Sequence, residues 1–181
     1  DDGEQRWNND KATYLRDTWM RDALNELGHP NAHGKFVHLF INNLYWGLYN
    51  IAERPTASFF ADYFGGDKSE WDVVKDFQEL HDGTLTAWNE MMALANNAGL
   101  DNLTKCQRLL GNNPDGTRNA AFPVYVHWPS FRDYMIAHIC SGAEDWPDHD
   151  YWAGRRRGAL SDGFHFTAWD QEISNDSLTR M

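Results

Sequence analysis

Residues 35–41 and 45–53, KFVHLFI and YWGLYNIAE, are two runs of β-branched and aromatic side chains on either side of Asn42-Asn43. Asparagine tolerates a positive φ better than most residues, so this pair predicts the tight turn of a β-hairpin that ends at Glu53. No alternation of strands and helices follows the hairpin. An early hairpin of this kind favours an α+β fold over a doubly wound parallel sheet.

The rest of the chain has mainly helical periodicity, which predicts a helical C-terminal part within one domain over residues 1–181. Helices are predicted at residues 9–27, 56–64, 84–99, 101–111 and 129–142, and further strands at 70–77 and 163–170. Glycine and proline separate these segments, and no internal repeat is present.

The composition excludes several classes of protein. With 41% hydrophobic residues and nine tryptophans, the chain can bury a sizeable core. A net charge of −11 argues against nucleic-acid binding, since the only basic run is Arg155–Arg157. No apolar run is long enough to span a bilayer, and the first residues lack the apolar stretch of a signal peptide. The chain begins at Asp1 without an initiator Met, so we expect it to be a fragment with any export signal upstream.

The cysteines and histidines do not predict a metal site. Cys106 and Cys140 lie in predicted helices without a CxxC motif, which leaves a disulfide or two buried free thiols as alternatives. The histidines form no HxxxH or HExxH pair, so each is interpreted as structural. The histidines considered are His33, His38, His127, His138, His149 and His165.

The acids concentrate late in the chain, where residues 144–152 read EDWPDHDYW. Asp145 and Asp150 are five residues apart on this loop, and Asp170 ends the strand predicted at 163–170. Protein kinases use this order of a loop acid, a second oxygen ligand and an acid from the next strand to orient a hydroxyl and to hold Mg²⁺. The spacing predicts three carboxylates within reach of one metal. The alternative is a solvated set of acids in a chain that has 27 of them.

Five segments together resemble the CotH-type spore-coat kinase domain. They are YLRDTWMRD, VHLFINNLYWGLYNIAERP, YFGGDKSEWDVVKD, EDWPDHDYWAGRRR and FHFTAWDQE. The resemblance covers nearly the whole chain, and its most specific part is the hairpin with YWGLYNIAE. It implies an atypical protein kinase, secreted or associated with a surface or spore coat. Such a kinase would use ATP and Mg²⁺ or Mn²⁺ to phosphorylate Ser or Thr of a protein substrate.

The resemblance assigns roles residue by residue. Asp145 matches the catalytic loop acid, Asp170 matches the DFG-like metal ligand, and Glu53 matches the glutamate that closes the hairpin near the nucleotide. Asp150 occupies the second metal-ligand position. We therefore expect Glu53 to point toward the same cleft as Asp170. Strand alternation then divides Tyr45, Trp46 and Tyr49 between core and cleft.

Other candidate nucleotide-binding residues have two interpretations each. Trp146 and Trp152 are either core anchors for the loop or a platform on which the base stacks. Arg155 and Arg156, together with Arg157, either meet phosphates, or one of the three pairs with a nearby carboxylate while the others face solvent. Glu53 has an alternative of its own, an ordinary ion pair with Arg54 or a neighbour.

The sequence departs from the family pattern at two positions, which leaves three classes of function open. Ala143 and Asp150 stand where the family usually has Asn, and neither a Gly-rich phosphate loop nor an obvious phosphate-pairing lysine is present. The family domain normally begins upstream of Asp1. The alternatives to an active kinase are a degenerate kinase-like interaction protein of a surface or coat, and a carbohydrate-binding domain that uses exposed aromatic side chains.

Overall fold

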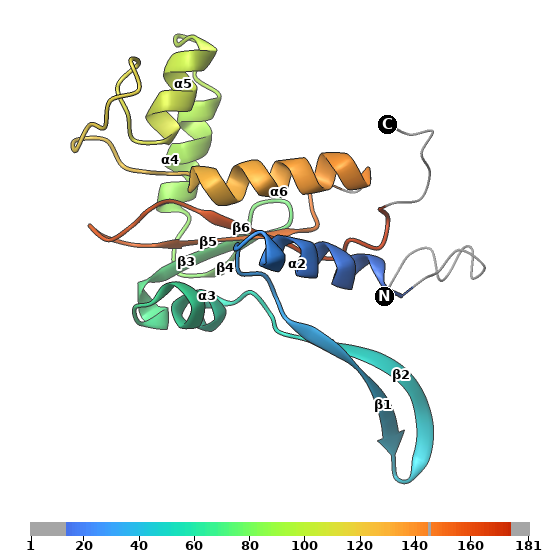
Figure 1. The fold of residues 1–181 in the computed structure, drawn as a ribbon. Helices are drawn as coiled ribbons and strands as arrows, with labels where there is room; N and C mark the ends of the chain where they lie inside the picture. The colour runs from blue at the N-terminus through green and yellow to red at the C-terminus, as the bar shows by residue number, and fades with distance from the viewer. Residues whose placement is uncertain (1–13, 145, 175–181) are drawn as a thin grey trace.

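A computed structural model describes residues 14–144 and 146–174, and its described part is a mixed structure of helices and two small antiparallel sheets (Figure 1). The predicted α+β class is confirmed. In chain order the elements are α2 (Arg16–Glu26), β1 (Gly34–Ile41), β2 (Leu44–Ala52), α3 (Ala57–Phe64), the 3₁₀ turn η1 (Lys68–Glu70), β3 (Trp71–Lys75), β4 (Glu79–Asp82), α4 (Thr86–Ala95), α5 (Asn102–Leu109), α6 (Trp128–Ser141), β5 (Tyr151–Arg156) and β6 (His165–Ala168).

The predicted hairpin is formed by β1 and β2, which pair antiparallel. Asn42 and Asn43 have φ angles of 49° and 64°, both in the left-handed region that a tight hairpin turn requires. The hairpin projects away from the rest of the described chain (Figure 1). Tyr45, Trp46 and Tyr49 are 57, 62 and 42% exposed. Their expected division between core and cleft is therefore wrong, because none of them is buried.

The second sheet has the strand order β4-β3-β5-β6, and every pair in it is antiparallel. Side chains alternate across it, so each face has its own core. Val74 and Tyr151 pack with α2, α4 and α6 on one face. Val73 and Trp152 pack with Phe60 of α3 on the other. In Figure 1 α6 and α3 accordingly lie on opposite sides of these strands.

Two strands of this sheet, β4 and β5, were not predicted. β5 is buried along nearly its whole length, so its sequence YWAGRR has no alternation of polar and apolar residues. Gly154 is required by packing, since a Cβ there would lie 2.4 Å from the ring of Phe60. β5 is the second strand from the β6 edge of the sheet. The acidic loop leads directly into this buried strand.

The predicted helices are present with shifted ends, and the part of the first helix predicted at residues 9–13 lies outside the described residues. α6 ends at Gly142, which adopts the left-handed conformation with φ of 61°. Cys106 and Cys140 are both free and both exposed, so neither the disulfide nor burial of the thiols is found. Within the described residues, no helix combines the length and apolarity that crossing a membrane requires.

Candidate functional site

The strand register brings Asp150 and Asp170 to the same end of the β5–β6 pair. Tyr151 pairs with Ala168, so Asp150 lies opposite Trp169 just outside the ladder, and Asp170 is the next residue along the chain. The Asp150 carbonyl accepts hydrogen bonds from the Trp169 amide at 3.3 Å and from Nε2 of Gln171 at 3.1 Å. The third predicted acid, Asp145, lies outside the described residues.

The end of β3 holds the acidic loop at Asp150. The Asp150 amide donates to the Asp76 carboxylate at 3.0 Å, and the Phe77 amide donates to the Asp148 carbonyl at 2.7 Å. The Asp150 carboxylate is mostly buried and lies 2.7 Å from Nδ1 of His149. Asp150 also has a positive φ of 65°, which turns the loop into β5. These contacts hold the buried Asp150 carboxylate at the end of the β5–β6 pair.

Asp170 lies among further acids that the sequence reasoning missed, Glu172 and Asp17. Burial, then a hydrogen bond to Asp170 and its charge, hold the pKa of Glu172 well above its ordinary value. Burial also raises the pKa of Asp17 against the opposing charge of Arg21, whose guanidinium is 2.9 Å away. The oxygens of these three acids do not all lie within 4.8 Å of one another. Like charges crowded this way favour either protons or a cation.

Comparison with known proteins decides the family. The sequence model of the family described as CotH kinase protein matches residues 5–180, nearly the whole chain. The chain belongs to the CotH kinase family. A search of curated proteins finds no match. Membership indicates a kinase-like domain, with the Asp150–Asp170 end of the sheet as the place where its late acids gather.

Glu53 of this CotH domain joins the base of the hairpin to α3. Its carboxylate accepts from the His33 amide at 2.9 Å and from the Tyr63 hydroxyl at 3.0 Å. Burial and this contact raise the pKa of Tyr63 to about 12. The alternative partner, Arg54, instead places its guanidinium 5.3 Å from the centre of the Trp152 ring. The Glu53 side chain therefore braces the hairpin, and its predicted position near the nucleotide stays a prediction.

Arg155 and Arg156 lie at the opposite end of β5 from Asp150. Burial lowers the pKa of Arg155, whose Nε donates to the Val124 carbonyl at 3.2 Å. Arg156 pairs with Glu70 at 2.7 Å. Arg157 pairs with buried Asp72. Two arginines therefore pair with carboxylates where the alternative expected one, and Arg155 is buried and does not face solvent. Contact of Arg155 or Arg156 with a nucleotide remains a prediction.

Lys75 lies at the Asp150 end of the sheet and carries a positive charge. The sequence reasoning did not single it out. It pairs with Trp152 in the β3–β5 ladder, and its ammonium lies 5.8 Å from the centre of the Trp152 ring. Its ammonium forms ion pairs with Asp76 at 3.7 Å and with exposed Glu79 at 3.3 Å. The signal in the sequence was the position of Lys75 at the end of a buried strand, just before Asp76.

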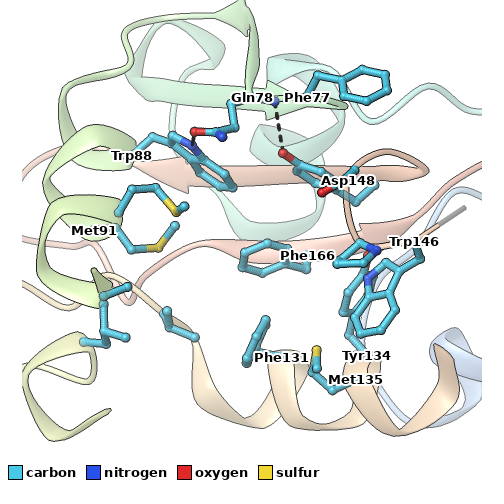
Figure 2. Close-up of a pocket in the computed structure, with 16 residues that line it drawn as sticks. Phe77, Gln78, Trp88, Met91, Phe131, Tyr134, Met135, Trp146, Asp148 and Phe166 are labelled. Atoms are coloured by element: carbon cyan, nitrogen blue, oxygen red, sulfur yellow. Dashed lines mark hydrogen bonds between the residues drawn. The ribbon is translucent and has the colours of Figure 1, made fainter. Parts of the chain in front are cut away.

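Trp146 lies on the other face of the sheet from Trp152. Its ring centre is 5.2 Å from that of His138 and 6.3 Å from that of Tyr134, both on α6. It borders an apolar cavity of about 750 Å³ between α4, α6 and the sheet, shown in Figure 2 with Phe131 and Phe166. Trp152 is 1% exposed and is a core anchor, as one interpretation predicted. A base stacked on Trp146 would have to enter this cavity.

Proposed function

We propose that this chain is the metal-dependent phosphotransferase domain of an atypical protein kinase that acts on Ser or Thr of secreted or surface proteins. The observation that supports the proposal is that the strand register sets Asp150 and Asp170 at the same end of the β5–β6 pair. Membership of the CotH kinase family supports it. In this proposal Asp145 orients the acceptor hydroxyl and accepts its proton.

The acids at this end fit a divalent metal. Mg²⁺ and Mn²⁺ prefer hard oxygen ligands, and Asp150, Asp170 and Glu172 offer only carboxylates. A bound ion would neutralise charge on the transferring phosphoryl group. Burial, then the hydrogen bond to Asp170 and its charge, raise the pKa of Glu172, and a bound cation would relieve the crowding of these acids. We assign Asp170 and Asp150 as ligands and Glu172 as a third acid available to the same ion.

Four cations are candidates to bind the phosphates of ATP. Arg155 and Arg156 would have to leave their present partners and lie about five residues along β5 from Asp150. Lys75 and Arg54 both stand over the Trp152 ring at the acidic end. We therefore place Lys75 and Arg54 as the nearer candidates for the phosphates.

A degenerate, kinase-like interaction protein is the second candidate, and two observations favour it. Asp150 adds a charge to an end that already holds Asp170 and Glu172, and this charge repels phosphate unless a second cation is bound. The hairpin also exposes large apolar side chains, among them Trp46 at 62% and Leu44 at 70%. Such a surface suits a protein partner, or a carbohydrate for its aromatic rings.

Calorimetric titration with MgATP and with MnATP tests the proposal. Asp170→Asn removes a metal ligand, so nucleotide affinity should fall at least about tenfold, or 1.4 kcal/mol. Asp115→Asn is the control, because Asp115 is an exposed loop residue that bonds only Thr117 among the contacts seen. Equal affinity of Asp170→Asn and the wild type would remove Asp170 from the site. No binding by the wild type with either metal would favour the degenerate alternative.

A further inference from the structure

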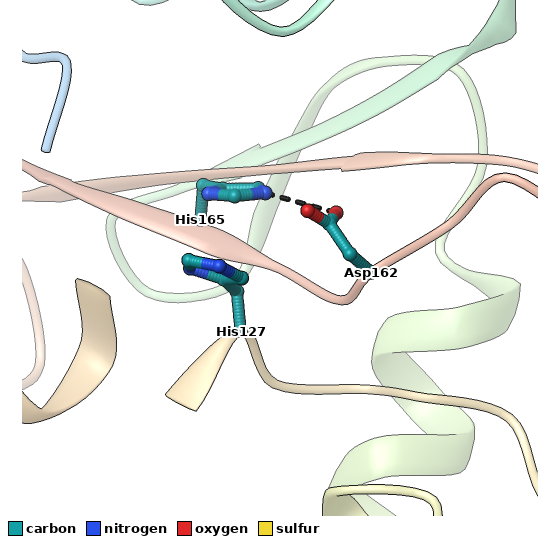
Figure 3. Close-up of side chains that lie close together, drawn as sticks. All are labelled: His127, Asp162 and His165. Atoms are coloured by element: carbon teal, nitrogen blue, oxygen red, sulfur yellow. Dashed lines mark hydrogen bonds and ion pairs between the residues drawn. The ribbon is translucent and has the colours of Figure 1, made fainter. Parts of the chain in front are cut away.

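The opposite end of β6 carries a second cluster of ligand-type side chains. His165 is the first residue of β6, Asp162 precedes it by three residues, and His127 caps the start of α6. The nearest ligand atoms of these three residues all lie within 4.8 Å of one another, which holds for no other group of three or more among the described acids, histidines and cysteines. Figure 3 shows the two imidazoles face to face, with the Asp162 carboxylate at the edge of His165.

The backbone builds this cluster from segments far apart in sequence. Val126 and Phe164 form a parallel bridge, and the His127 amide donates to the Phe164 carbonyl at 3.2 Å. The approach is close enough to require a glycine. A Cβ on Gly163 would lie 2.5 Å from the His127 nitrogen, and Gly163 has a φ of 110°. The two imidazoles are therefore held side by side, with their ring centres 4.2 Å apart.

The hydrogen bonds of His127 leave one of its ring nitrogens ready to bind a metal. The Ser130 hydroxyl donates to the His127 carbonyl at 3.1 Å, so its oxygen is left to accept from Nδ1 of His127 at 2.9 Å. Nε2 then carries the lone pair. Metal-bound histidines usually have their second nitrogen fixed in this way.

His165 and Asp162 have a spacing close to that of two ligands on one ion. Nε2 of His165 lies 2.9 Å from the Asp162 carboxylate. Two ligands about 2.05 Å from a tetrahedral ion are about 3.3 Å apart, so an ion can replace the proton that bridges them. Small rotations of His127, which is half-buried, and Asp162, which is 58% exposed, would complete the contact. A cavity of about 50 Å³ borders both imidazoles and has room for a water.

We propose that His127, Asp162 and His165 form a Zn²⁺ site with water as the fourth ligand. Two imidazoles and one carboxylate are a donor set typical of zinc, whereas the carboxylates at the other end of β6 suit Mg²⁺. The ion would tie the segment before α6 to the turn before β6. This site does not depend on the kinase function proposed above.

Competition titration of the untagged, chelator-treated chain with Zn²⁺ and a chromophoric chelator tests this site. One equivalent should bind per chain, and His127→Gln and Asp162→Asn should each weaken Zn²⁺ binding at least about tenfold, as loss of one ligand does. His38→Gln is the matched control, because His38 lies on the exposed hairpin. Its Zn²⁺ affinity should equal that of the wild type. Co²⁺ bound in place of Zn²⁺ should give visible absorption that His127→Gln reduces.

Thermal unfolding gives a second measurement that does not depend on the chelator. Zn²⁺ should raise the Tm of the wild type and of His38→Gln, and should leave that of His127→Gln unchanged. The Zn²⁺ assignment is wrong if the wild type takes up no equivalent, or if His127→Gln and His38→Gln bind Zn²⁺ equally. In either case the cluster is a stacked, hydrogen-bonded pair that only supports the fold.

Discussion

The two ends of the β5–β6 pair differ in chemistry although the same two strands build both. At one end Asp150 and Asp170 lie beyond the Tyr151–Ala168 pair, where the ligand-type side chains are mainly carboxylates, with His149 beside Asp150. At the other end Gly154 pairs with His165, and the donors are two imidazoles and one carboxylate. A short antiparallel ribbon thus separates the site proposed for Mg²⁺ from the site proposed for Zn²⁺ by about the length of β6.

A substitution that disturbs the β5–β6 pair itself should affect the candidate sites at both of its ends together. Gly154→Ala places a Cβ against the Phe60 ring, and overpacking of a buried site should cost about 3 kcal/mol or more of unfolding free energy. Both nucleotide and Zn²⁺ binding should then be lost at the same temperature. Denaturant unfolding measures the cost. Gly99→Ala, on an exposed turn with ordinary φ, is the control and should change the unfolding free energy by less than about 0.5 kcal/mol.

A buried histidine near the acidic end should make stability depend on pH. Burial lowers the pKa of His138 to about 4, below the ordinary 6.5. The unfolded chain therefore takes up a proton first as pH falls through 6.5, and stability is lost between there and pH 4. The loss should reach about 2 kcal/mol by about pH 5. Denaturant unfolding at several pH values measures it. His138→Leu should remove this loss and His38→Gln should keep it; an equal pH dependence in both variants would contradict the assignment.

The smallest expected effects are those of a substitution at one end of the β5–β6 pair on ligand binding at the other end. Asp162→Asn should change MgATP affinity by less than about twofold, and Asp170→Asn should change Zn²⁺ affinity by equally little, because distant sites act additively. Calorimetry on both variants with both ligands measures all four values. A large loss of MgATP binding in Asp162→Asn would show that the two ends form one site.

Periodicity and turn chemistry predicted most of the fold. The hairpin with its Asn42-Asn43 turn, the helices and the strand β6 were all found near their predicted positions. β5 was missed because burial on both faces removes alternation, and because Gly154 and the arginines are not typical of strands. The hairpin aromatics were misjudged because alternation predicts which side chains share a face, but not whether another element covers that face.

The candidate sites show the same limit. Asp150 and Asp170 were predicted from their order and spacing along the chain. Glu172 was missed although it stands two residues after Asp170. His127 has no local spacing to His165, since only the Val126–Phe164 bridge brings them together. The one local signal for that cluster was the DxxH spacing of Asp162 and His165. This spacing is neither an HxxxH nor an HExxH pair, so those two patterns did not include it.

Transfer of radiolabelled phosphate from ATP tests most directly whether the acidic end is a kinase site. The wild-type chain should label a generic protein substrate or itself with Mg²⁺ or Mn²⁺. Asp145→Asn should abolish most transfer while MgATP binding stays within a few-fold, because its role is to orient the hydroxyl. Asp170→Asn should lose both transfer and binding, because it holds the metal. A wild type that neither binds ATP nor labels any protein with either metal would contradict the kinase proposal.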